Sequence, residues 1–140
     1  MKDASGAREA FIKSIVPLIK NLTWRDFELL VDLVFSSAGW RRLGVLGKTE
    51  KDIDLDMVQP VTQERIMIQV KAVASMEVAR NVENSAELLT QYSRVFLVTH
   101  SFLGALNTEN LRRVEIIDAQ RLAPLVLDAG LSDWLLEKSS

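Results

Sequence analysis

Two neighbouring segments of this 140-residue chain carry an apolar side chain at every second position, and this pattern constrains the fold more than any other feature. The segment 52–58 reads DIDLDMV, and the segment 65–72 reads RIMIQVKA. A period of two is typical of a β-strand with one face in the core and one polar face. The intervening residues 59–64 contain Pro60 and suit a loop. We therefore expect an antiparallel hairpin.

Helices and further strands are expected on both sides of this hairpin. Apolar residues at helical spacing predict helices over 7–19 and 76–92. Capping and stop residues predict three more: one from a cap at Thr23 to a stop at Gly39, one from a cap at Asp118 to residue 129, and a short one that begins at Ser132. Strands are expected over 40–46, 95–99 and 114–117, and a short helix could follow His100. The continuous apolar runs of the last two strands are typical of a parallel sheet. Together these elements predict an α/β fold with a mixed β-sheet flanked by helices.

Composition limits the classes of protein to consider. With 48% hydrophobic residues, the chain can bury a core of single-domain size. It contains no cysteine, which excludes disulfides, zinc–thiolate sites and a cysteine nucleophile. Its net charge of −2 argues against nucleic-acid binding through bulk positive charge, although a nuclease with clustered carboxylates remains compatible with it.

Targeting signals are not evident in the sequence. Residues 1–10 are polar and lack an apolar signal core, and no apolar run approaches the roughly 20 residues needed to cross a bilayer. We therefore expect a cytoplasmic protein without a membrane partner.

The polar face of the hairpin gathers groups that suit phosphate chemistry. Directly opposed residues of an antiparallel pair share a face. With a loop centred on 62–63, Asp54 would face Lys71. Asp56 would then face Gln69. Carboxylate and amide oxygens are ligands that Mg²⁺ prefers, and a lysine can position water and offset charge on a phosphoryl group.

At this point the sequence resembles a known family. The PD-(D/E)xK nuclease superfamily has the signature D…(D/E/Q)xK. This sequence is similar to it, with Asp54, then a loop, then Gln69-Val70-Lys71 within IMIQVKA. The Gln-x-Lys form resembles its Mrr-like restriction endonuclease branch. The stretch TWRDFELLVDLVFSSAGW resembles that branch's first core helix, and VFLVTHSF and VEIIDAQRLAPLV resemble its later segments. The resemblance extends over 23–127 and implies a restriction-endonuclease-like αβββαβ core.

The resemblance also implies roles for individual residues. Asp54 would be the principal ligand of Mg²⁺ or Mn²⁺, and Gln69 would occupy the position of the second acidic ligand. Lys71 would be the catalytic lysine. Glu28 matches a helix glutamate that supplements the site, and the backbone carbonyl of Val70 could be a further metal ligand.

Each candidate also has an ordinary structural interpretation. We expect Asp56 to belong to a solvated strand face. Gln69 and Lys71 could form an exposed cross-strand pair worth at most about 1 kcal/mol. Glu28 could equally be a solvent-facing helix residue.

Other polar and aromatic residues are harder to assign. Trp24 and Trp40 are expected to pack in the core, and His100 is expected to have a structural or peripheral role. Four basic residues that lie close together could contact phosphate or form a solvated basic loop: Arg41, Arg42, Lys48 and Lys51.

The leading functional hypothesis is a metal-dependent endodeoxyribonuclease of the Mrr-like type, with DNA as its partner. Cutting both strands of a duplex needs two sites, which suits a homodimer or a larger assembly. Because no helix-turn-helix or zinc finger is evident, the chain could also work with further domains of a longer protein. Two alternatives remain open: a catalytically inactive nuclease-fold module that binds DNA or a partner, and a junction- or RNA-directed nuclease. The expected division is an N-terminal helix over 1–22, a nuclease domain over 23–130 and a C-terminal helix or tail over 131–140.

Overall fold

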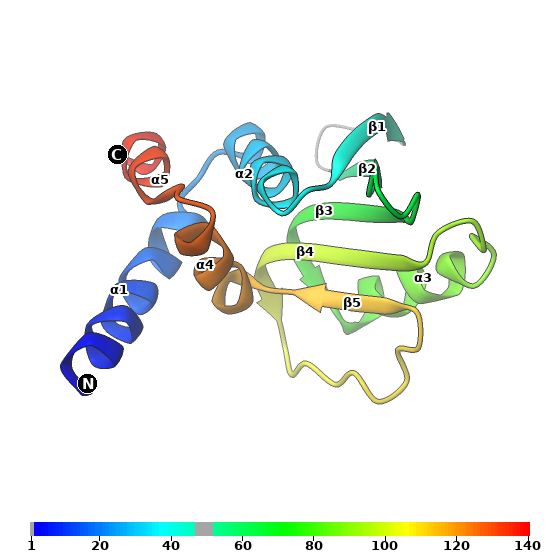
Figure 1. Cartoon of the computed structure of the whole chain (residues 1–140). Helices are drawn as coiled ribbons and strands as arrows, with labels where there is room; N and C mark the ends of the chain where they lie inside the picture. Colours follow the sequence, from blue (N-terminus) through cyan, green and yellow to red (C-terminus); the bar gives the residue numbers. More distant parts are fainter. Residues whose placement is uncertain (1, 47–51) are drawn as a thin grey trace.

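The computed structural model describes residues 2–46 and 52–140 (Figure 1). Its helices in these ranges are α1 (Lys2–Lys20), α2 (Trp24–Ser37), α3 (Met76–Ala86), α4 (Ala119–Asp128) and α5 (Ser132–Ser139). Its strands are β1 (Arg41–Leu46), β2 (Asp52–Val58), β3 (Arg65–Ser75), β4 (Arg94–Leu103) and β5 (Val114–Ile117). The strands form one sheet in the order β1-β2-β3-β4-β5. Because β1 to β3 pair antiparallel and β3 to β5 pair parallel, the predicted mixed sheet is confirmed.

The hairpin of β2 and β3 forms as predicted, but its register differs from the expected one. Asp54 pairs with Gln69, and Asp52 pairs with Lys71. The loop closes through a hydrogen bond of 2.8 Å from the Gln59 amide to the Glu64 carbonyl, which shifts each partner by two residues from the expected pairing. A shift of two leaves every side chain on its expected face, because strand side chains repeat with that period.

Two hydrophobic cores lie on the two faces of the sheet. The first packs α1, α2, α4 and α5 against residues such as Leu55, Ile68 and Val70. The second packs α3 against residues that include Met67 and Leu97. In Figure 1 the four helices of the first core, α1, α2, α4 and α5, gather at one side of the sheet, whereas α3 lies apart from them. The hairpin thus has its apolar face under α2 and its other face, with Gln69 and Lys71, beside α3.

Local signals in the sequence explain where several helices begin and end. The Thr23 hydroxyl accepts a hydrogen bond of 3.2 Å from the Asp26 amide, as its capping motif predicts. The Asp118 carboxylate accepts one of 2.9 Å from the Arg121 amide and caps α4. Gly39 follows α2 at a φ of 97°, a conformation that other residues rarely adopt.

Other boundaries were predicted wrongly because long-range contacts set them. Helix α3 ends at Ala86, six residues early, since the chain must turn back so that the Ser93 amide can bond the Arg65 carbonyl at 2.8 Å. After His100, β4 continues to Leu103 and no helix occurs over 104–113. Ser132 does not cap α5: its cap position is Leu131, whose amide bonds the Val126 carbonyl at the end of α4.

None of the helices in the described ranges combines the length and apolarity that crossing a bilayer requires.

Candidate functional site

The β2–β3 hairpin brings the three central candidates together. Asp54 lies directly opposite Gln69, and Lys71 follows two positions along β3 on the same face. All three side chains are half-buried. Leu55, Ile68 and Val70 point to the opposite face and are buried in the first core, which holds the register and the orientation of the polar side chains.

A cavity of about 160 Å³ opens beside two of these residues. Gln69 and Lys71 of β3 line one side of it, and Val78, Asn81 and Ser85 are among the α3 residues that line the other. The helix is placed there because Ser75, the last residue of β3, caps it by accepting a hydrogen bond of 3.4 Å from the Val78 amide. The cavity therefore gives a ligand access to the candidate lysine.

The remaining candidates, Asp54, Glu28 and Val70, do not line this cavity. Asp54 pairs with Gln69, which lines the cavity, and the Oδ1 atom of Asp54 is buried. Glu28 is half-buried on α2, the helix that packs on the other face of the sheet. The side chain of Val70 is buried in the core, so only its backbone carbonyl could serve a metal. Glu28, Asp54 and Lys71 are each engaged in an interaction within the protein.

The donor set limits which metal this site could hold. Among the side chains that the structure describes, those of residues 6–43 and 54–140, no group of three or more histidine, aspartate or glutamate residues has the geometry to hold a metal ion. Mg²⁺ is commonly bound by only one or two carboxylates and keeps several waters. A carboxylate opposite an amide, as in Asp54 and Gln69, fits such a loosely held, hydrated ion and does not fit a closed structural metal cage.

Asp56 does not have the solvated position that its sequence pattern predicted. It is 8% exposed and forms an ion pair with Arg65. The guanidinium of Arg65 lies 5.1 Å from the ring centroid of the buried Tyr92. Burial is the largest cause that raises the pKa of Tyr92, followed by the charge of Asp56. Asp56 is thus part of a buried polar cluster near the hairpin loop, because Arg65 follows that loop and can reach back to it.

His100 packs as a structural residue at the end of β4. Its ring packs against the Phe27 ring in a T-shaped arrangement with centroids 4.7 Å apart, and its Nδ1 lies 2.8 Å from the Ser101 hydroxyl. Burial is the main cause that lowers the pKa of His100 below its usual 6.5, and the charge of Lys20 lowers it further. The neutral imidazole is therefore the form that the fold favours.

This preference predicts an acid-sensitive contribution to stability. A lowered pKa in the folded state means that His100 binds a proton more readily in the unfolded chain. The contribution of the neutral imidazole to the free energy of unfolding should therefore be fully present above pH 6.5, and it should be lost as the pH drops through the folded-state pKa of His100. Urea unfolding of the wild type between pH 7.5 and 5 should show this loss. The His100→Gln variant, which cannot titrate, should show a shallower loss over the same range. Parallel curves for the two proteins would contradict the assignment.

The other residues singled out from the sequence fall into three groups. Arg42 forms an ion pair of 2.7 Å with Asp32, and Arg41 is exposed at the start of β1. Lys48 and Lys51 lie outside the described residues. Trp24 and Trp40 are half-buried and pack against the first core, as predicted.

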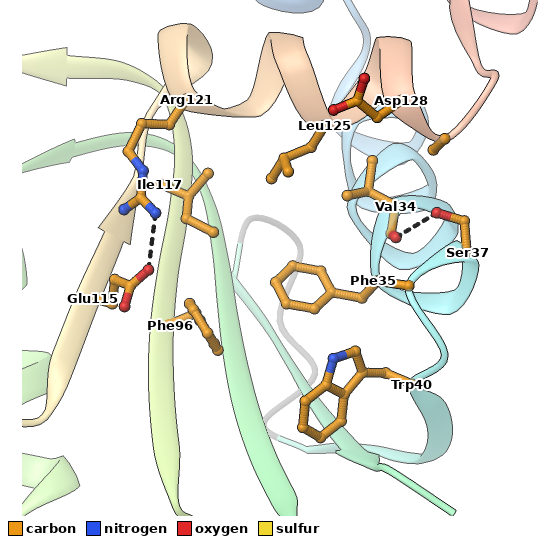
Figure 2. A pocket seen from close by; sticks show the side chains of 12 residues that line it. Val34, Phe35, Ser37, Trp40, Phe96, Glu115, Ile117, Arg121, Leu125 and Asp128 are labelled. Carbon is orange, nitrogen blue, oxygen red and sulfur yellow. Dashed lines mark hydrogen bonds and ion pairs between the residues drawn. The ribbon is translucent and has the colours of Figure 1, made fainter.

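Trp40 also lines a cavity of about 490 Å³ between the end of α2, the sheet and α4. Figure 2 shows its ring facing this cavity together with Phe35 and Phe96, while Arg121 and Glu115 are paired at the opposite rim. Arg121 and Glu115 also line a second groove with three further arginines, Arg94, Arg112 and Arg113, which the sequence patterns did not predict. Only the adjacent Arg112-Arg113 pair signalled it in the sequence.

Comparison with known proteins agrees with the fold. The family model Mrr_cat, described as a restriction endonuclease, matches residues 19–126 and so covers most of the chain, from the end of α1 into α4. No curated protein and no solved structure matches the chain. The mixed five-stranded sheet with its flanking helices is consistent with the restriction-endonuclease-like fold. The chain therefore belongs to the Mrr-like restriction endonuclease family, a family of nucleases.

Proposed function

We propose that this protein is a metal-dependent endonuclease that hydrolyses DNA phosphodiester bonds at the β2–β3 hairpin. The observation that carries the proposal is the placement of Gln69 and Lys71 along one open cavity, with Asp54 opposite Gln69. Phosphodiester hydrolysis needs a positioned water and positive charge where negative charge develops. An ammonium group beside oxygen donors at an accessible cavity meets these needs.

Each residue has a defined part in this scheme. The carboxylate of Asp54 and the amide oxygen of Gln69 would hold Mg²⁺ or Mn²⁺, with Glu28 and the Val70 carbonyl as further ligands. When bound, the ion supplies positive charge to the phosphate oxygens. The Lys71 ammonium orients the attacking water and offsets charge on the phosphoryl group. The water oxygen bonds to phosphorus while the bond to the 3′ oxygen breaks, which leaves a 5′-phosphate and a 3′-hydroxyl.

The same proposal has consequences for assembly. One cavity can cut one strand at a time, so cleavage of both strands of a duplex would use two copies of the chain. We therefore propose a homodimer on DNA, or further domains that hold the cavity on the duplex.

A plasmid assay tests the proposal directly. Supercoiled DNA, unmodified and modified, is incubated with the full chain and either Mg²⁺, Mn²⁺ or EDTA. We expect nicked or linear product with a metal and no product with EDTA. The Arg80→Ala variant changes an exposed α3 residue outside the cavity and should cut like the wild type. Equal cutting with metal and with EDTA would contradict the proposal.

The neutral side chain at position 69 favours a second candidate, a nuclease-fold module that binds DNA or a partner without cutting. An amide contributes less to metal affinity than a carboxylate does, because it carries no charge. For such a module, the plasmid assay gives no product while DNA binding persists in EDTA. Gln69→Glu would then be expected to raise Mn²⁺ affinity.

A panel of duplex, branched and single-stranded DNA and RNA distinguishes the duplex nuclease from a junction- or RNA-directed one.

A further inference from the structure

Four arginines from three separate segments meet at the β5 edge of the sheet. They line a groove of about 510 Å³ that is distinct from the cavity at the β2–β3 hairpin: Arg94, Arg112, Arg113 and Arg121. Glu115 is the acidic residue among the groove's lining side chains, and Thr108 adds a hydroxyl. This concentration of positive charge stands out on a chain whose net charge is −2.

The charges of these arginines are only partly neutralised. Glu115 is shared, with its Oε2 at 2.9 Å from Arg121 and its Oε1 at 3.4 Å from Arg94. Arg113 donates to two neutral acceptors, the carbonyls of Leu89 at 3.0 Å and of Tyr92 at 2.8 Å. Among the residues that the structure describes, Arg112 has no ion-pair partner. The groove therefore carries excess positive charge.

The groove is also built on rigidly held backbone. The carboxylate of Glu83, which is 5% exposed, accepts hydrogen bonds from the backbone amides of Arg113 and Val114 at 2.9–3.1 Å. A separate hydrogen bond of 2.7 Å ties the Arg121 guanidinium to the Ile116 carbonyl. Guanidinium groups held in fixed directions are suited to bidentate recognition of phosphate oxygens.

An aromatic cavity adjoins this groove. Glu115 and Arg121 line both the arginine groove and the cavity of about 490 Å³ that contains Phe35, Trp40 and Phe96 (Figure 2). Each volume lies within the range of small-molecule sites, about 300–1,000 Å³. A flat heterocyclic base can stack on aromatic rings, and its phosphates can pair with arginines. The two neighbouring environments match the two halves of a nucleotide.

We propose that this edge of the sheet is a nucleotide-binding site, in which the arginine groove holds phosphate groups and the aromatic cavity accepts the base. The site is separate from the candidate nuclease residues. Arg94 lies beside Ile66 in the β3–β4 ladder and Lys71 lies beside Thr99, so five residues, or about 16 Å of strand, separate the two positions. The ligand is either a free nucleotide or a nucleotide unit of DNA.

Calorimetric titration of the full chain in EDTA tests this site without metal at the hairpin. The probes are ATP, pyrophosphate, adenosine and a single-stranded oligonucleotide. We expect ATP to bind more tightly than pyrophosphate or adenosine, because each of these offers only half of the recognised groups. The double variant Arg94→Ala/Arg112→Ala should weaken binding at least about tenfold through the lost charge-assisted bonds.

A control variant that removes two arginines outside the groove separates a local effect on binding from a general loss of positive charge. Arg25→Ala/Arg80→Ala removes the same charge from exposed arginines outside the groove and should change binding less than about twofold. Selective weakening by the groove pair supports the proposal, and whether ATP or only the oligonucleotide binds identifies the source. Equal weakening by both pairs, or no binding of either ligand at millimolar concentration, overturns it.

The base position has a test of its own. Trp40→Leu keeps an apolar side chain in the cavity but removes the large flat ring. We expect this change to reduce the preference for ATP over pyrophosphate while leaving pyrophosphate binding intact. An unchanged preference would overturn the placement of the base. Because these titrations need neither metal nor cleavage, their failure is distinguishable from a failure of the nuclease proposal.

Discussion

Lys71→Ala is expected to lower the rate of DNA cleavage by about 10²–10⁴-fold while DNA affinity changes only a few fold. The side chain lines the cavity beside Gln69, where an attacking water would have to be positioned. Contributions of this size are typical of groups that position or transfer protons in the transition state. Single-turnover cleavage of a labelled duplex measures the rate, and fluorescence anisotropy in EDTA measures the affinity.

Two further variants separate chemistry from folding in this experiment. Lys71→Met keeps the length of the side chain and should lose as much activity as Lys71→Ala. Arg80→Ala removes a positive charge from the exposed side of α3 and should retain activity. If both Lys71 variants cut DNA at the wild-type rate, then the cleavage does not arise at this cavity.

Asp54→Asn is expected to weaken Mn²⁺ binding by about 100-fold and to remove metal-dependent cleavage. A carboxylate that binds a divalent ion contributes several kcal/mol, and about 2.8 kcal/mol corresponds to 100-fold. Because Gln69 opposite it is neutral, no second charge on this pair compensates for the loss. Asparagine has nearly the same shape, so the half-buried position should remain packed. Electron paramagnetic resonance of bound Mn²⁺ and calorimetry measure the Mn²⁺ affinities of the wild type and of the variant.

Its control is Asp133→Asn, which removes one negative charge from an exposed position on α5. This variant should bind Mn²⁺ and cut DNA as the wild type does. Unchanged Mn²⁺ affinity in Asp54→Asn would remove this residue from the metal ligands, even if cleavage were lost. Loss of folding would appear instead as a changed urea midpoint.

Local patterns in the sequence were enough to predict most of the scaffold. The alternation in β2 and β3 assigned each side chain to a face, and that assignment held when the register shifted by two, because both registers keep Leu55 and Ile68 in the core. Caps at Thr23 and Asp118 were also predictable, since a capping side chain bonds an amide only three residues away. The family resemblance rested on the hairpin motif together with the order of the segments around it over 23–127.

Features that depend on distant segments were not predictable in this way. The burial of Asp56 required Arg65 and Tyr92 to close over it, and the end of α3 was set by the return of the chain to Arg65. The arginine groove joins β4, the start of β5 and α4, which no local period relates.

The sequence by itself thus determined the family, most of the helices and strands, and which hairpin residues share a face. Only the tertiary structure decided which residue opposes Asp54, that a cavity lies beside Lys71 and that charges from separate segments converge at the β5 edge. The physical reason is range: periodicity and capping act over a few residues, whereas register, cavities and charge clusters depend on how whole elements pack.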